Sequence, residues 1–131
     1  MNIQDLTALF RQEGDAMVGS ELGEQDLISL ARAEGRAKPF CVVQEWFYLE
    51  ADVSKLELKM VSDRGWQPAL LLALKVLRDE RGRYPAGGWV RSGFQVGFYQ
   101  GCMFETENTL DLLQGNGHRK RVGLGVLSHL S

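Results

Sequence analysis

The densest cluster of charged groups in the sequence consists of His118, Arg119, Lys120 and Arg121. The segment has the character of a strand, and successive side chains of a strand point to opposite faces. His118 and Lys120 are therefore predicted on one side of a sheet. Arg119 and Arg121 are predicted on the other side, so only half of the cluster can face one ligand.

A neighbouring predicted strand adds Trp89, Arg91 and Tyr99 to these basic groups. Sheet surfaces that stack bases or grip phosphates use this mixture of rings and cations. A protein-binding surface and an edge strand protected by charge against aggregation stay open as alternatives. The candidate partner-binding residues are Trp89, Arg91, His118, Arg119, Lys120 and Arg121.

Three carboxylates are candidates for acid and base chemistry. Glu105 and Glu107 lie two apart on a predicted strand, so both would point to one face, and Asp111 could join them. No histidine, serine or lysine is tied to them by a known catalytic spacing. Exposed glutamates that face basic residues on nearby strands are the commoner arrangement, and we assign no catalytic residue.

Other motifs exclude several classes of site. Gly115-Asn116-Gly117 is flanked by predicted strands and is expected to be a turn rather than a phosphate loop. The sequence contains no nucleophile elbow, zinc-protease or Walker motif. His118 and His129 have no acidic or cysteine companion at ligand spacing, so we expect no metal and no cofactor. Cys41 and Cys102 are expected to be reduced thiols, mostly buried.

The secondary structure that would position these residues begins with two amphipathic stripes in the first 35 residues. The stripes predict an acidic helical hairpin. The first stripe starts at Ile3, and the second includes Leu27, Ile28 and Ala31 and ends at Gly35. Residues 40–49 are rich in β-branched and aromatic residues, including the rings of 46–48 that we assign mainly to the core, and predict a strand. Residues 54–61 alternate and favour a half-buried strand, with a short helix as the alternative.

A deep helix is predicted from Pro68 to Arg81, with proline at its first position, packed on a sheet. Residues 89–100 predict one strand that is bent or bulged at Gly93 and Gly97. Two further strands would meet at a tight turn with Asn108 in the positive-φ region, and a hairpin at Asn116-Gly117 would lead into the last strand. The predicted fold is α+β, a single domain over residues 1–131, with an antiparallel sheet of about five strands.

With 131 residues, 44% hydrophobic and 24% charged, the chain has the composition of one soluble globular domain. The longest apolar run, residues 69–74, is far shorter than a membrane span, and the start does not resemble a secretory signal. We therefore expect a cytoplasmic protein without membrane association. The net charge of −2 argues against a broad basic field for nucleic acid, although residues 1–35 carry −5 and residues 36–131 carry +3.

Four pieces of the sequence carry a resemblance to a known family. They are the lead-in Arg81 to Gly88, the WVRS of Trp89 to Ser92, the FETENT of Phe104 to Thr109, and the LLQGNGHRK of Leu112 to Lys120. Over about residues 80–122 they resemble a small bacterial family classed only as a domain of unknown function. The resemblance implies a bacterial chain, carried on prophages or other mobile elements, and it implies no activity.

These observations favour a non-enzymatic accessory protein that binds another protein through its sheet face and acidic helices. Regulation of a host system, such as a defence complex, is one role for such a protein. One alternative is a nucleic-acid-binding regulator that uses Arg91, Arg119, Lys120 and Arg121. A second is a small enzyme or ligand-binding domain with a pocket between helix and sheet. Unpaired strand edges make a homodimer reasonable.

Overall fold

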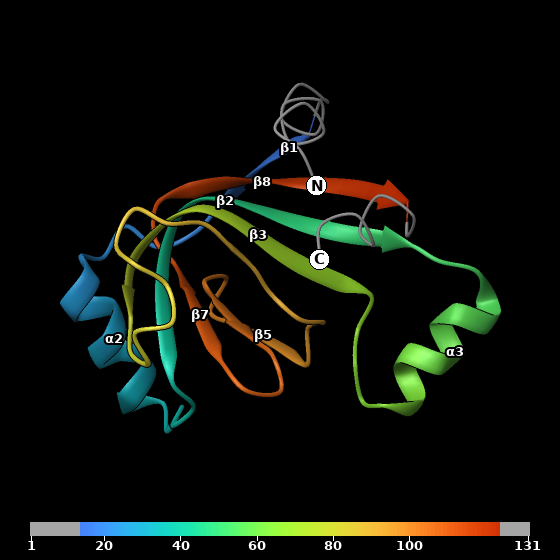
Figure 1. Ribbon diagram of the computed structural model, residues 1–131, viewed down its shortest axis with the longest axis horizontal. Coiled ribbons are helices and arrows are strands. Elements are labelled where there is room, and N and C mark those ends of the chain that lie inside the picture. Colours follow the sequence, from blue (N-terminus) through green and yellow to red (C-terminus); the bar gives the residue numbers. More distant parts are fainter. Residues whose placement is uncertain (1–13, 124–131) are drawn as a thin grey trace.

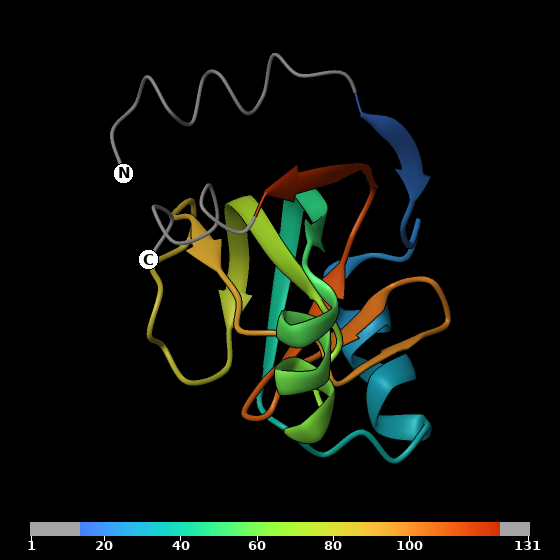
Figure 2. The ribbon, with the colours of Figure 1, turned by 90° about the vertical axis from the view of Figure 1, so that its right-hand side faces the viewer.

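The computed structural model describes residues 14–123, and within them eight strands form one curled sheet accompanied by two helices (Figures 1 and 2). The sheet order is β1-β8-β2-β7-β6-β5, and β3 pairs with β2 and with β4. The elements are β1 (Asp15–Val18), α2 (Glu24–Ala33), β2 (Phe40–Asp52), α3 (Lys55–Asp63), β3 (Ala69–Asp79), β4 (Val90–Arg91), β5 (Gly97–Tyr99), β6 (Met103–Glu105), β7 (Leu110–Leu113) and β8 (Asn116–Gly123).

The 13-residue strand β2 is the centre of the sheet. One of its edges pairs antiparallel with β3. Its other edge is shared by two strands placed end to end, because β7 pairs parallel with residues 40–43 and β8 pairs parallel with residues 47–52. Glu45 has φ 53° at the break between these two partners, and Gly115, with φ 71°, turns the chain from β7 into β8.

The sheet buries side chains on both faces. Alternate residues of β2 and β3 enter two different clusters, as expected when successive side chains point to opposite faces. One cluster includes Leu71 and Ala73 and is covered in part by Leu27 and Ala31 of α2. The other cluster contains Phe47, Leu49, Ala51, Leu70, Leu72 and Val122.

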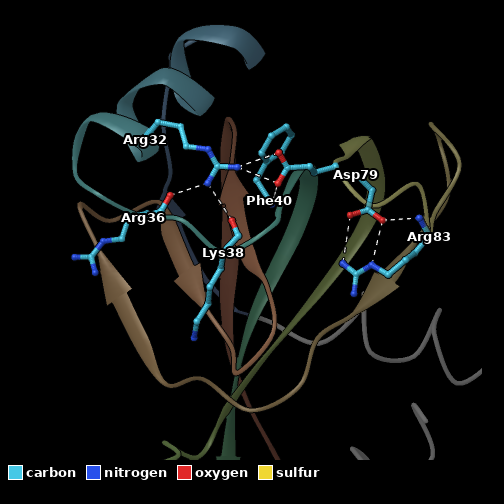
Figure 3. A network of polar contacts seen from close by, with 7 residues as sticks. Arg32, Arg36, Lys38, Phe40, Asp79 and Arg83 are labelled. Atoms are coloured by element: carbon cyan, nitrogen blue, oxygen red, sulfur yellow. Dashed lines mark hydrogen bonds and ion pairs between the residues drawn. The ribbon is translucent and has the colours of Figure 1, made fainter.

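Helix α2 is fastened to the sheet by Arg32 near its C-terminus. The guanidinium donates to the carbonyl oxygens of Arg36 and Lys38 and to both carboxylate oxygens of Glu80 (Figure 3). Glu80 also accepts a hydrogen bond from the backbone N–H of Phe40 at the start of β2. The connection between α2 and β2 is therefore fixed against the end of β3.

The predicted helix from Pro68 to Arg81 is wrong, because residues Ala69–Asp79 form strand β3. Leu71 and Ala73 lie in one core cluster while Leu70 and Leu72 lie in the other. A strand buried on both faces has a continuous apolar run, and periodicity does not distinguish such a run from a buried helix. With β1 and the division of residues 89–100 into β4 and β5, the sheet has eight strands rather than about five.

Residues Lys55–Asp63 form helix α3 rather than the predicted half-buried strand, so the alternative of a short helix is confirmed. The helix starts with a capping box: the Ser54 side chain accepts from the backbone N–H of Glu57, and the Glu57 carboxylate accepts from the backbone N–H of Ser54. No residue of α3 is buried, and Figure 1 shows the helix projecting beside the sheet.

The predicted N-terminal helical hairpin is also wrong. The second helix exists as α2, but residues Asp15–Val18 before it form strand β1, which pairs antiparallel with Asn116–Arg119 of β8. The expected first helix, from Ile3, lies mostly outside the described residues, as does the segment after residue 123.

The C-terminal part of the sheet differs from the predicted meander. Residues 89–100 are divided into β4 and β5, and no hairpin forms at Asn116-Gly117, because β7 and β8 both pair with β2 instead of with each other. The turn between β6 and β7 is present, but Asn108 does not adopt a positive φ. Among residues 14–123, no helix is long and apolar enough to cross a membrane.

Candidate ligand-binding site

A cavity of about 390 Å³ opens where three separate segments of the chain meet. The segment at the start of β3 contributes Trp66 and Leu70. The second runs from the loop after β3 through β4, and the third is the β6–β7 turn with the start of β7. Its lining consists of Trp66, Leu70, Arg83, Tyr84, Val90, Arg91, Ser92, Gly93, Phe94, Thr106, Glu107, Asn108, Thr109 and Asp111.

Asp111 is the most buried charged residue of this lining, with 3% of its surface exposed. It sits on β7, directly opposite Cys41 of β2. Among the described residues, no side chain or backbone group forms a hydrogen bond with its carboxylate. Burial raises the pKa of Asp111 to about 7, Asp79 adds to the rise, and Arg83 opposes it.

Arg83 is held in place by Asp79, whose side chain is completely buried. Its Nε, Nη2 and backbone N–H all donate to the Asp79 carboxylate, at 3.2, 3.3 and 2.8 Å (Figure 3). Although burial acts to raise the pKa of Asp79, the hydrogen bonds and charge of Arg83 outweigh it and the pKa is lowered. The pair is therefore ionised, and Asp111 lies next to a charge pair that is already balanced.

Arg91 of β4 brings a second guanidinium to the cavity. Its Nε atom is buried and has no hydrogen-bond partner within residues 14–123. A buried donor without a partner is unusual in folded proteins, because the group has lost water without gaining a replacement. Arg91 and Asp111 thus bring a cation and a carboxyl group to the same cavity, and Arg91 also keeps one buried donor unpaired.

Two hydroxyl groups of the cavity, those of Ser92 and Thr106, are in contrast occupied by the fold. Ser92 Oγ accepts from the backbone N–H of Leu71 and donates to the carbonyl of Gly93. Thr106 Oγ1 bonds with the backbone of Thr109 and closes the β6–β7 turn. Because these hydroxyl groups already bond to the backbone, the charged side chains are the groups with which the cavity could bind a ligand.

Aromatic side chains form one wall. Trp66 and Phe94 stack with centroids 5.5 Å apart and an interplanar angle of 25°. Trp66 Nε1 donates to Glu107 Oε1 at 2.8 Å, which joins the start of β3 to the β6–β7 turn. The wall is therefore supported from two segments of the chain.

The predicted partner-binding residues do not gather at one place. Trp89 is 50% exposed, and Arg91 lines the cavity. Strand β4, which carries Arg91, is separated from β8 by β3 and β2. The structure therefore keeps Trp89 and Arg91 apart from the basic cluster of β8.

Within β8, the basic residues also divide. His118 stacks on Phe47 with centroids 5.6 Å apart, and Lys120, only 5% exposed, lies with its Nζ 5.2 Å from the centre of the same ring. Arg119 forms an ion pair with Glu50, and Arg121 is exposed. Two of these four residues therefore share the Phe47 face.

The two glutamates that are candidates for acid and base chemistry lie in different environments. Glu105 accepts from the Tyr99 hydroxyl and forms an ion pair with Lys38, each at 2.7 Å. Although burial opposes the change, these contacts lower the pKa of Glu105. Glu107 bonds with Trp66 instead, and the carboxylate that enters the cavity beside it is Asp111.

The thiols do not offer a reactive group. Cys41 and Cys102 are both free and buried. Burial, with the nearby charges of Asp111 and Asp79, raises the pKa of Cys41 to about 12, so its thiol stays protonated at neutral pH. In the part of the chain that is described, no group of three or more His, Cys, Asp or Glu side chains is arranged to hold a metal ion.

Sequence reasoning found Arg91 but missed Arg83, and it placed Asp111 on an exposed face. One signal was available for Asp111, since it is the single charged residue in the otherwise apolar strand Leu110–Leu113. A carboxylate within a run of leucines is buried when both faces of its strand are covered. No comparable local signal marks Arg83, whose role depends on Asp79.

The fold and cavity define a domain with one curled, mixed sheet and a polar pocket at the meeting point of its loops. The chain belongs to the family described as Domain of unknown function (DUF6957), whose model matches residues 17–129. The resemblance to an uncharacterised family is therefore confirmed. No curated protein and no solved structure matches this chain.

The motifs that carried the resemblance contribute much of the cavity. Arg83 and Tyr84 come from the lead-in segment, and residues 90–92 come from WVRS. Residues 106–109 come from FETENT. Two stretches that are separate in sequence thus meet around Asp111.

Proposed function

We propose that this domain binds a small molecule in the cavity around Asp111 and Arg91. The observation that carries the proposal is the Asp111 carboxylate, which lines the cavity, is 3% exposed and receives no hydrogen bond from the described residues. A carboxylate with so little exposure is poorly solvated, so a group in the cavity that donates to it would stabilise it. A bound ligand with suitable polar groups would supply that donor.

The size and composition of the cavity support the same function. Sites for small molecules usually have volumes of roughly 300–1,000 Å³, apolar or aromatic walls and a few polar groups that fix orientation. The cavity has about 390 Å³, the stacked Trp66 and Phe94, and the side chains of Arg83, Arg91 and Asp111. A carboxyl whose pKa lies near neutrality is a further feature typical of functional sites.

A fragment library screened by ligand-observed NMR tests the proposal. The variants Asp111→Asn and Arg91→Met each remove one of the two polar groups, and both are expected to weaken the binding of hits at least tenfold. Asp52→Asn makes the same chemical change at an exposed site outside the cavity and should bind like the wild type. The proposal fails if no fragment distinguishes the wild type from the two cavity variants.

Protein binding is the second candidate function, and helix α3 favours it. Leu56 and Met60 are one helical turn apart, 69% and 60% exposed, on a helix that buries none of its residues. An apolar groove on a partner protein would take this helix face. Leu56→Glu with Met60→Glu should abolish nuclease-resistant capture of a stoichiometric partner, and unchanged capture would contradict the role of α3.

Either function suits a cytoplasmic accessory protein of a bacterium or one of its mobile elements, which is the setting that the family resemblance implies. Two free, buried thiols suit a reducing compartment. For the host-regulation role, we expect that the capture experiment returns a component of a host system.

A further inference from the structure

The charges around the cavity limit the kind of ligand that it can hold. The charge of Arg83 is already balanced by Asp79, so the cavity lining is left with one cation, Arg91, beside Glu107 and the Asp111 carboxyl. An anionic ligand would meet Glu107 and Asp111, and a cationic ligand would meet the Arg91 guanidinium. The balance favours a ligand that carries no net charge.

Arg91 and Asp111 demand different atoms from the ligand. The guanidinium of Arg91, which lines the cavity, is only a donor, so it binds an acceptor such as a carbonyl oxygen or a ring nitrogen. Asp111, whose pKa is about 7, accepts through a carboxyl oxygen in either protonation state, so it binds N–H or O–H donors of the ligand. A suitable ligand therefore has donors and acceptors on one molecule.

The aromatic wall adds a condition on shape. Trp66 and Phe94 are stacked and are held from two sides, by the start of β3 and by Glu107 of the β6–β7 turn. Flat aromatic walls bind planar rings well because stacking buries a large area with little loss of freedom. Because the Trp66 ring already carries Phe94 and, 5.1 Å from its centre, the Arg64 guanidinium, a planar ligand would stack on Phe94.

We infer that the ligand is a neutral, planar nitrogen heterocycle of the nucleobase type, with an amino group toward Asp111 and an acceptor toward Arg91. This inference rests on the proposed function and narrows it to one ligand class. Carboxylates that accept from an exocyclic amino group, combined with ring stacking, are a general way of recognising an exposed base. The base could belong to a free nucleoside or to a single strand.

Isothermal titration calorimetry with defined probes tests the ligand class. The panel contains adenosine, cytidine, guanosine and uridine as neutral bases, benzoate as a planar anion and benzamidine as a planar cation. We expect at least one amino-bearing nucleoside to bind at least tenfold more tightly than benzoate, benzamidine and uridine. Asp111→Asn and Arg91→Met should each weaken this binding at least tenfold, while Asp52→Asn should leave it unchanged.

The outcomes separate the ligand class from the proposed function. Tighter binding of benzoate or benzamidine that depends on Asp111 would overturn the ligand class and leave the cavity as a binding site. If neither the panel nor the fragment library shows binding that depends on Asp111, both proposals fail. A ten-nucleotide single strand that binds more tightly than its nucleosides, with the same dependence on Asp111, would support a base within a strand as the source.

Discussion

The indole ring of Trp46 packs directly against the backbone of Gly117. A Cβ added at Gly117 would lie 2.4 Å from both Cδ2 and Cε3 of the ring. The ring also lies close to Gly19, and its Nε1 donates to the carbonyl oxygen of Gln114 at 3.2 Å. The Trp46 side chain is thus enclosed by two segments, the residues that follow β1 and the start of β8.

This contact predicts that Gly117→Ala destabilises the protein. Even one added methyl group must displace the ring or the strand, and overpacking of this kind costs roughly 1–3 kcal/mol. Urea unfolding should show the loss as a lower midpoint with an unchanged slope. Gly93→Ala is the matched control, because an added Cβ there meets no atom within 4 Å. Equal stability of the two variants would contradict the proposed packing constraint.

Asp111 predicts a specific dependence of stability on pH. Its pKa in the native state is about 7, whereas the ordinary value is 3.8. Between these values the native state holds a proton that the unfolded state releases, so the free energy of unfolding falls as pH rises. The change amounts to on the order of 4 kcal/mol across this window. Asp111→Asn removes the titrating group and should be more stable than the wild type at pH 8.

Urea unfolding at pH 5 and pH 8 measures this effect. The difference in stability between Asp111→Asn and the wild type should grow from pH 5 to pH 8. Asp52→Asn should keep the wild-type dependence, since Asp52 is exposed at the end of β2. A wild-type pH profile in Asp111→Asn would exclude the elevated pKa.

The Asp79–Arg83 pair predicts strong coupling between two substitutions. Arg83→Met leaves the buried Asp79 carboxylate without its counter-charge, which should cost roughly 1–3 kcal/mol because Arg83 is itself partly exposed. In an Asp79→Asn background the same change should cost much less. A double-mutant cycle measures the difference, with exposed Arg81→Met as the control. Additive losses would show that the pair does not stabilise the fold.

The capping box predicts local rather than global behaviour in α3. Because no residue of α3 is buried, the hydrogen bonds at its start contribute much of its stability. Ser54→Ala should cost about 1 kcal/mol locally and accelerate amide exchange in α3 roughly fivefold. Exchange in β2 and β3 should not change. Ser62→Ala, within the same helix, should leave amide exchange near the wild-type rate. Equally fast exchange in both variants would show that the Ser54 cap does not stabilise α3 specifically.

Local patterns predicted those elements whose periodicity has a single interpretation. The stripe of Leu27, Ile28 and Ala31 became α2, and the β-branched and aromatic residues after Pro39 became β2. The prediction for residues Ala69–Asp79 was wrong because a continuous apolar run is compatible with both a buried helix and a buried strand. The predicted Asn116-Gly117 hairpin is absent because β7 and β8 both pair with β2, and such long-range pairing is not contained in local turn preferences.

The cavity was accessible to sequence analysis only in pieces. Arg91 was selected for its charge, but its contribution depends on the position of β4 beside β3. The burial of Asp111 follows from its parallel pairing with Cys41, far away in the chain. Parallel pairing across such a distance leaves no trace in local spacing, so a residue expected on an exposed face became the centre of the site.

The pairing of β1 has a consequence for the order of folding during synthesis. Within residues 14–123, β1 pairs with no strand except β8, and Asp15 lies opposite Arg119. A ribosome therefore releases β1 about a hundred residues before its partner strand exists. The long edge of β2 that β8 covers stays open for a shorter time, while about seventy residues are synthesised. Chaperone contact during translation is therefore expected at residues 47–52. It should end when β8 is synthesised and pairs with both β1 and β2.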